Sequence, residues 1–162
     1  MTRNHRMAMR NFFLAVALIF IAFACTDGKT YYKFQPVDAT GWHKDSAAVF
    51  DVDIADSIQS FDVLINVRNG GEYPYQNLWL FIKRTGPDKL VLNDTVECYI
   101  ADPMGKWKGS GIGSRYEVSV LYQQNQQFGA KGIYHFEIRQ GMREEKLKGL
   151  YEIGFMVKNV QK

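Results

Sequence analysis

Residues 61–68, FDVLINVR, alternate apolar and mostly polar side chains, with the apolar ones at positions 61, 63, 65 and 67. Successive side chains of a β-strand point to opposite faces of a sheet, so a period of two indicates a strand with one buried face. The branched valine and isoleucine side chains also fit the pleated surface of a sheet. This stretch therefore predicts a strand that packs against a core on one side.

The same period recurs along the rest of the chain. Further strands with one apolar face are predicted at Phe50–Ile54, Val96–Ile100, Val118–Val120, Tyr134–Ile138 and Ile153–Val157. Leu78–Ile82 (LWLFI) is apolar at every position, which predicts a strand with both faces covered. We therefore expect Trp79 to fill the core.

Turn signals separate these stretches at short intervals, as in GPD at residues 86–88 and DPMG at residues 102–105. This pattern favours an all-β fold, an antiparallel β-sandwich that is jelly-roll-like and has about seven to nine strands. Parallel βαβ units would need helical crossovers. We expect at most one short helix, at residues 141–150 (GMREEKLKGL), where a glycine limits each end.

The amino-terminal segment has a different character. Residues 1–24 contain three arginines and no acidic residue, and Phe12–Phe23 is an unbroken apolar run of twelve residues. A helix of that length would span about 18 Å, short of the roughly 30 Å hydrocarbon core of a bilayer. We therefore predict that residues 1–24 are a lipoprotein signal peptide that is removed, rather than a membrane-spanning helix.

Ala24 and Cys25, at the end of the apolar run, resemble a bacterial lipoprotein box, in which diacylglycerol is attached to the cysteine before cleavage. We predict that Cys25 is the lipid attachment site and that its acyl chains bind the protein to the lipid bilayer. Two or three chains suffice for stable binding, because each buried methylene contributes about 0.8 kcal/mol. The alternative is a disulfide between Cys25 and Cys98, the other cysteine of the chain.

The predicted mature chain has two parts. Residues 25–40 are polar, include Gly28 and Pro36 and show no sustained period, which predicts a polar tether between the lipid and the domain. Residues 41–162 are predicted to form a single β-sandwich domain.

The charge of the chain argues against a nucleic-acid partner. The formal net charge is +3, but beyond residue 24 the chain has seventeen basic and seventeen acidic side chains. Nucleic-acid binding needs a basic surface that displaces counterions from phosphates. We therefore expect no nucleic acid among the partners.

No residue pattern typical of catalysis is found in the sequence. Gly109–Ser114 does not match the G-x-S-x-G motif of a nucleophile elbow. Beyond the signal peptide only His43 and His135 remain, and neither lies in a cluster with metal-ligand spacing. We predict no catalytic residue, no metal and no cofactor, so the protein is not expected to be an enzyme.

Aromatic side chains are the strongest candidates for binding. The candidates are Trp42, Tyr73, Tyr75, Trp79 and Trp107, with Tyr31 and Tyr32 in the predicted tether. Exposed aromatic rings suit the apolar faces of sugars, and they also suit protein interfaces. A glycan and a protein are therefore both candidate ligands.

Four blocks of residues follow the lipoprotein signal in a fixed order. They are Val67-Arg68-Asn69 leading to Tyr73-Pro74-Tyr75 and Asn77-Leu78; Ala101-Asp102-Pro103 with Gly105, Trp107, Gly109 and Gly111; Gly132-Ile133-Tyr134 followed by Gln140, Met142 and Arg143; and Gly149 with Ile153-Gly154. Together they resemble the gliding-motility lipoprotein H family (GldH) of the Bacteroidota. The resemblance implies an envelope lipoprotein, on the outer membrane, that the gliding machinery needs, and it brings no catalytic activity.

We therefore expect a membrane-anchored, structural or accessory component that binds other envelope or motility proteins. The residues expected to form the docking face are Arg68, Tyr73, Tyr75 and Trp107. Surface-exported lipoproteins of this group often carry an acidic cluster after the lipid attachment site, and the single acidic residue Asp27 instead favours a periplasmic face. The alternatives are a glycan-binding module and a general role in envelope assembly, because relatives also occur in bacteria that do not glide.

Overall fold

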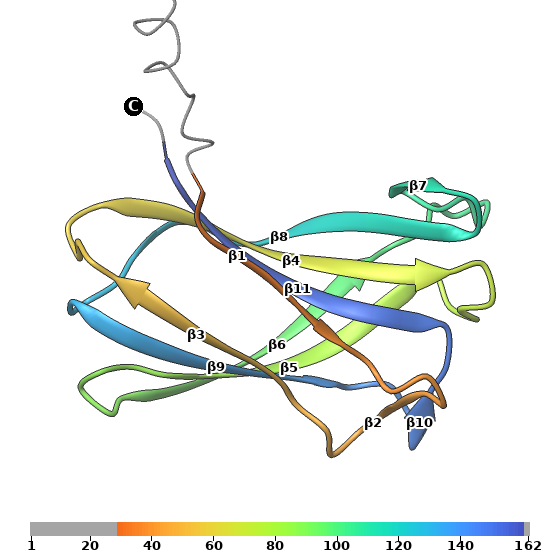
Figure 1. Cartoon of the computed structure of the whole chain (residues 1–162), viewed down its shortest axis with the longest axis horizontal. Coiled ribbons are helices and arrows are strands. Elements are labelled where there is room, and N and C mark those ends of the chain that lie inside the picture. Colours follow the sequence, from red (N-terminus) through yellow and green to blue (C-terminus); the bar gives the residue numbers. More distant parts are fainter. Residues whose placement is uncertain (1–28, 161–162) are drawn as a thin grey trace, which may run out of the picture.

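The computed structural model describes residues 29–160. These residues form eleven strands, and none of them is helical (Figure 1). The strands are β1 (Lys29–Pro36), β2 (Trp42–His43), β3 (Ala48–Ile54), β4 (Ser60–Gly70), β5 (Asn77–Thr85), β6 (Val91–Tyr99), β7 (Ser110–Ile112), β8 (Arg115–Gln127), β9 (Gly132–Gln140), β10 (Lys146–Leu147) and β11 (Leu150–Asn159). The prediction of an all-β fold is confirmed.

Two antiparallel sheets form the layers of a sandwich (Figure 1). One sheet has the order β1-β11-β4-β8-β7, the other has the order β3-β9-β5-β6, and β10 pairs with β2 separately. If the very short β2, β7 and β10 are left out, eight strands remain, and they can be counted from one to eight in chain order. One sheet then has the order 1-8-3-6 and the other has the order 2-7-4-5. This is the arrangement of a jelly roll, as predicted. The strand number exceeds the prediction because strands of two or three residues leave no period in a sequence.

The core lies between the two sheets and is filled by the alternating apolar residues of the long strands. The apolar positions of residues 61–68 all face it and are buried. Phe155 of β11 lies at its centre, with ring centroids 5.5 Å from Phe50 and 4.5 Å from Phe136. Each such side chain contributes about 1.5–3 kcal/mol on full burial, so these rings are major contributors to stability.

Residues 29–36 form an edge strand, β1, which pairs antiparallel with β11 over its length. Tyr31 packs toward the core and Phe34 packs on the outer face of the sheet. The prediction of a tether through residue 40 is therefore wrong for this segment. A strand that packs aromatic rings on both faces shows no period of two, which is why its sequence did not indicate a strand. The predicted signal peptide lies outside the described residues.

The short helix considered at residues 141–150 is absent. Residues 141–145 form a turn, and Lys146–Leu147 is the strand β10, which pairs with Trp42–His43 of β2. Leu147 is buried, so pairing with β2 places an apolar side chain in the core that a solvated helical turn would leave exposed.

The β5 strand is apolar on both faces, but only one face is covered. Leu78, Leu80 and Ile82 are buried in the core. Trp79 and Phe81 point to the outer face of the four-stranded sheet and are 38% and 52% exposed. The expectation that Trp79 fills the core is therefore wrong.

The two ends of the sandwich carry different segments (Figure 1). One end holds the start of β1 at Lys29, the end of β11, and the β3–β4, β5–β6 and β8–β9 connections. We call it the Lys29 end. The opposite end holds β2, β10, β7 and the start of β5.

Candidate functional site

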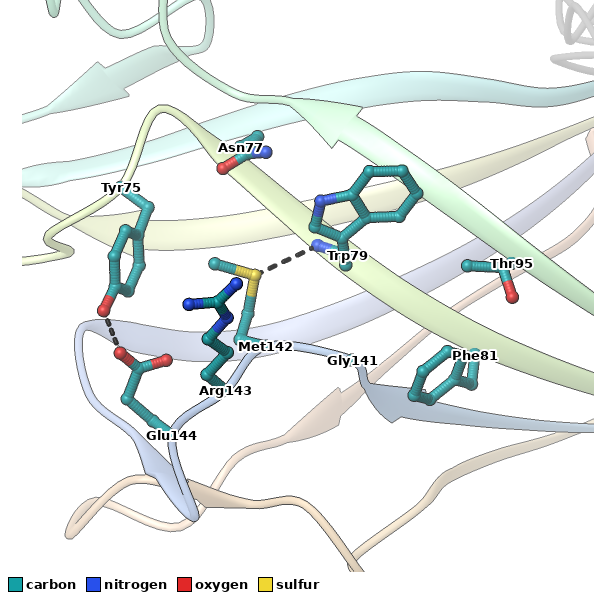
Figure 2. Close-up of a pocket in the computed structure, with 9 residues that line it drawn as sticks. All are labelled: Tyr75, Asn77, Trp79, Phe81, Thr95, Gly141, Met142, Arg143 and Glu144. Atoms are coloured by element: carbon teal, nitrogen blue, oxygen red, sulfur yellow. Dashed lines mark hydrogen bonds between the residues drawn. The ribbon is translucent and has the colours of Figure 1, made fainter.

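A groove of about 550 Å³ lies on the outer face of the four-stranded sheet, toward the end opposite Lys29 (Figure 2). The β5 and β6 strands form one side of it and the turn at residues 141–144 forms the other. The groove is lined by Tyr75, Asn77, Trp79, Phe81, Thr95, Gly141, Met142, Arg143 and Glu144. An apolar centre with a few polar groups around it is typical of ligand sites.

Trp79 and Phe81 supply the apolar surface of the groove. They are two residues apart on β5, so both side chains project from the same face, about 7 Å apart along the strand. The Phe81 ring lies close to the backbone of Gly141, where an added Cβ would be 3.1 Å from the ring. Two large aromatic side chains exposed side by side typically mark a binding surface rather than random exposure.

The turn at residues 141–144 is held by the buried side chain of Gln140 and by backbone groups of β5. Gln140 is only 2% exposed, and its Nε2 donates to the Glu144 carbonyl at 2.7 Å while its Oε1 accepts from the Met142 amide at 2.7 Å. The Gly141 amide donates to the Trp79 carbonyl at 2.7 Å. The Trp79 amide donates to the Met142 Sδ at 3.3 Å (Figure 2). These bonds hold the turn against β5, so the groove is formed before any ligand binds.

Polar groups at one side of the groove have unused bonding capacity. The Tyr75 hydroxyl donates to Glu144 Oε1, as Figure 2 shows, and this bond raises the pKa of Tyr75 above its usual value. The other carboxylate oxygen, Glu144 Oε2, is buried and has no hydrogen-bond partner among the described residues. Arg143 is exposed and makes no ion pair within residues 29–160. The groove therefore offers a ligand an exposed cation, whereas the free oxygen of Glu144 is covered by the protein.

The aromatic surface continues onto β6. Glu97 Oε1 accepts from Asn77 Nδ2 at 2.6 Å, and Glu97 Oε2 accepts from the Tyr99 hydroxyl at 2.9 Å. Tyr99 is itself exposed, beside Asn77 in the strand register. The carboxylate of Glu97 thus fixes two side chains at the margin of the groove.

Of the residues predicted as a docking face, Tyr75 alone lines this groove. Tyr73 is 3% exposed, its hydroxyl donates to the Asn77 carbonyl at 2.9 Å, and burial raises its pKa. Trp107 is half-buried, 6.4 Å from the Tyr73 ring and 5.9 Å from the Tyr116 ring. The prediction that Tyr73 lies on a surface is therefore wrong, because it packs in the core beneath Tyr75.

Arg68 lies on the other sheet. Its Nε donates to Glu117 Oε2 at 2.8 Å and its Nη1 donates to Glu152 Oε2 at 2.6 Å. It lines a second groove, of about 580 Å³, on the outer face of the five-stranded sheet. The four predicted residues therefore do not share one face. Arg68 lies on the outer face of the five-stranded sheet, whereas Tyr75 lies beside the four-stranded sheet.

The predicted lipid attachment site, Cys25, lies outside the described residues. Cys98 is a free thiol in β6, and its burial raises its pKa to about 12. Within residues 29–160 no group of three or more His, Cys, Asp and Glu side chains is placed to hold a metal ion. The same residues include no apolar helix with the length needed to cross a bilayer.

Residues 29–157 match the family model described as GldH lipoprotein. The chain belongs to the GldH lipoprotein family. It is 32% identical over 152 residues to a gliding motility lipoprotein GldH homolog of Christiangramia forsetii, covering 90% of this chain and 93% of that protein. It is 28% identical over 158 residues to the gliding motility lipoprotein GldH of Flavobacterium johnsoniae, covering 93% and 98%.

Among solved structures, part of a family GH115 4-O-methyl-alpha-glucuronidase aligns with this chain. Its TM-score is 0.44 at 12% identity, over 80% of this chain and 16% of that chain. The expected family is confirmed by the family model and the two GldH relatives. The chain is thus a GldH envelope lipoprotein of a family associated with gliding motility.

Sequence reasoning missed most of the groove of this GldH lipoprotein. Met142 and Arg143 belong to a block that carried the family resemblance, but they had no assigned role. In LWLFI the aromatic side chains occupy alternate positions and the aliphatic ones occupy the others. That segregation by face was the available signal for an exposed aromatic surface on β5.

Proposed function

We propose that this GldH lipoprotein is a non-catalytic accessory component of the gliding machinery, and that its groove docks a partner protein of the cell envelope. The acylated Cys25 anchors it in the outer membrane, with the domain on the periplasmic side. The observation that carries the docking proposal is the exposed Trp79–Phe81 pair in a preformed groove. Aromatic side chains are enriched among the residues that dominate the binding energy of protein interfaces.

Two features support a docking role over catalysis. The relatives are named as lipoproteins of gliding motility, not as enzymes. The turn at residues 141–144 is already bonded to β5, so a partner loses little free energy in ordering it. An anchored protein also meets its partners within a thin layer, which raises their effective concentration and makes modest interfaces sufficient.

The groove is tested in a deletion strain of the source bacterium. The deletion is expected to abolish spreading on agar, and the parent gene is expected to restore it. A variant carrying both Trp79→Ala and Phe81→Ala should reach the parent's abundance without restoring spreading. Met104→Ala is the control, because this side chain is 95% exposed outside the groove. Full spreading with the double variant at parental abundance would overturn the docking proposal.

The anchor is tested separately. In Cys25→Ser the acceptor of the lipid is removed, so radiolabelled palmitate should no longer be incorporated and the protein should leave the membrane fraction. Protease added to intact cells should leave the parent protein uncut, as a periplasmic location requires. Digestion in intact cells would place the domain on the cell surface instead.

A saccharide is a second candidate ligand for the same groove. The exposed guanidinium of Arg143 donates hydrogen bonds that sugar hydroxyl oxygens accept, while the C–H faces of a sugar stack on rings such as Trp79. Glycan arrays followed by Trp79→Ala test this candidate. Trp107→Ala is unsuited to the purpose, because Trp107 packs against Tyr73 and the substitution would disturb the fold. Absence of binding at millimolar saccharide would exclude a glycan.

A further inference from the structure

Two connections and the start of one strand at the Lys29 end each expose an aliphatic side chain. Ile58 between β3 and β4 is 81% exposed, Leu90 between β5 and β6 is 58% exposed, and Ile133 at the start of β9 is 61% exposed. Single exposed aliphatic residues are ordinary, but three from separate segments at one end are not. We call Ile58, Leu90 and Ile133 the aliphatic patch.

Contacts between the segments that carry these side chains show that the segments are neighbours. Gln127 Nε2 donates to the Ile58 carbonyl at 3.2 Å, and Gln127 also lines a small cavity together with Leu90. At Gly132 an added Cβ would lie 3.1 Å from the Pro87 Cβ, so the start of β9 abuts the β5–β6 turn. The three segments therefore form one continuous end of the sandwich.

Local hydrogen bonds hold two of the three side chains in place. The Ile58 amide donates to Asp56 Oδ1 at 3.1 Å, and the Leu90 amide donates to Asp88 Oδ1 at 3.0 Å. Each aspartate thus stabilises a turn that carries an exposed aliphatic residue, Ile58 in the β3–β4 connection and Leu90 at the base of the β5–β6 turn opposite Gly86. The fold fixes the positions of Ile58 and Leu90, so these side chains can contact a bilayer without a rearrangement of the domain.

The polypeptide reaches the sandwich at this same end. Lys29 lies opposite Lys158 in the sheet, and the Val160 amide donates to the Ser60 carbonyl at 3.0 Å beside it. Cys25 precedes Lys29 by four residue steps, which span at most about 14 Å. With lipid on Cys25, the Lys29 end is therefore held at the membrane surface.

We infer that the aliphatic patch is a membrane-contact surface, at which Ile58, Leu90 and Ile133 insert into the boundary between headgroups and acyl chains. The inference rests on the proposed anchor at Cys25. Lys89 and Lys131 are exposed beside the patch, but so are Asp56 and Asp88, so the burial of apolar surface rather than charge carries the contact. A lipid surface is the occupant that the short link to the anchor brings to this end of the domain.

Membrane contact at the Lys29 end also determines how far the groove lies from the membrane. Trp79 lies six residues before Thr85, which is at the Lys29 end of β5, so the groove is about 20 Å further from the membrane along the strand. The aromatic surface then lies on the side of the domain, on the outer face of the four-stranded sheet and clear of the lipid, where a partner in the envelope can reach it. Contact at several points fixes the tilt of the domain, which a lipid anchor by itself leaves free.

The test uses the full acylated lipoprotein in vesicles of phosphatidylethanolamine and phosphatidylglycerol. Ile58→Cys, Leu90→Cys and Ile133→Cys are each labelled with a polarity-sensitive fluorophore, and the buried Cys98 does not compete for label. The label at each of the three positions should shift its emission to shorter wavelength and be quenched by nitroxide lipids. Met104→Cys, an equally apolar and exposed position at the other end, is the control and should show neither change.

The outcomes separate this inference from the anchor. Lipoprotein that does not partition into the vesicles would overturn both the anchor and the inference. Lipoprotein that partitions, but whose label at Ile58→Cys stays as water-exposed as at Met104→Cys, would overturn the inference alone. Labels that become shielded only when envelope proteins are added would assign the patch to a protein partner and likewise overturn it.

Discussion

The guanidinium carbon of Arg68 lies 3.7 Å from the centroid of the Phe34 ring. Phe34 belongs to β1, the strand nearest the proposed anchor, and Arg68 belongs to β4 in the middle of the same sheet. Arg68 is in turn held by Glu117 and Glu152, which lie on the strands on either side of β4. Besides the hydrogen bonds that pair β1 with β11, this stack fastens the edge strand to the middle of the sheet.

Removing the Phe34 ring should therefore loosen β1. We expect Phe34→Ala to lower the free energy of unfolding by about 2 kcal/mol, less than for a fully buried ring, because it removes apolar contacts and a cation–π interaction. Urea denaturation measures the loss, and hydrogen exchange should show faster exchange of the β1 amides. Lys33→Ala, an exposed position on the same strand, is the control. Equal stability of the two variants would show that the stack does not hold β1.

Substituting Gly149 and Gly105 by alanine separates two contributions to the free energy of unfolding, the strain of a positive φ and the overlap of the added methyl group with its neighbours. Both have a φ of +82°, so alanine is strained at either position. A Cβ at Gly149 would lie 2.5 Å from the Tyr73 Cα, whereas a Cβ at Gly105 has no atom within 4 Å. Gly105→Ala should lower the free energy of unfolding by about 1–2 kcal/mol. Gly149→Ala should lower it by at least about 2 kcal/mol more, because neither the backbone at Gly149 nor that at Tyr73 can move away without disturbing the core.

Thermal and urea denaturation of both variants measure this difference. A difference near zero would mean that the backbone around Tyr73 can move away from the added methyl group. In that case the buried Tyr73 would not be the rigid support of Tyr75 that its contacts indicate.

The buried thiol of Cys98 predicts both slow labelling and loss of stability in alkali. Burial raises its pKa from 9.0 to about 12, so the folded protein keeps the thiol protonated where the unfolded chain ionises it. The unfolded state therefore binds fewer protons above about pH 9, and the free energy of unfolding falls as pH rises from 9 toward 12. In a Cys25→Ser background, Cys98 should react with a thiol reagent at pH 8 only as fast as the protein opens.

A neighbouring position on β6 supplies the control. Tyr99→Cys places an exposed thiol next to Cys98 on the same strand and should react within the mixing time. Fast labelling of both positions would show that β6, an edge strand of the four-stranded sheet, opens readily in the native protein. Unchanged stability between pH 9 and 12 would contradict the raised pKa.

Sequence periodicity predicted the layers but not what covers them. In a strand such as residues 61–68, the side chains that face the core are apolar and those that face water are mostly polar. The alternation therefore indicates which face is buried. At β5 water lies over Trp79 and Phe81, so the apolar pattern there does not reflect burial by the same chain. Hydrophobic pattern by itself cannot distinguish a surface covered by the same chain from one covered by a partner.

The remaining differences concern residues whose environment depends on distant segments. Tyr73 is buried because it packs against Trp107, thirty-four positions along the chain, and no local pattern encodes that contact. The segment from Lys29 to Pro36 becomes a strand because the edge of β11 offers it hydrogen bonds. The groove likewise depends on a turn after β9 that folds back onto β5. These are tertiary pairings, which a single sequence does not specify.

The turn that walls the groove should depend on the amide of Gln140. Its Oε1 accepts from the Met142 amide and its Nε2 donates to the Glu144 carbonyl, so Gln140→Leu leaves both backbone groups without their partner. We expect a loss of about 1–3 kcal/mol per group that stays buried and unpaired. Hydrogen exchange should show faster exchange at Met142, and the emission of Trp79 should change as Met142 leaves its amide. Gln124→Leu, an exposed glutamine on β8, is the control.

Gln140→Glu separates the two hydrogen bonds. An ionised carboxylate still accepts from the Met142 amide but repels the Glu144 carbonyl, whereas a protonated carboxyl accepts the first bond and donates the second. The side chain is buried, which favours the protonated form, so the variant should regain exchange protection of the turn as the pH is lowered. Gln140→Leu should show no such recovery, because it has no group to protonate. If both variants respond to pH alike, or if neither alters the turn, the groove is held by the Gly141–Trp79 and Trp79–Met142 bonds rather than by Gln140.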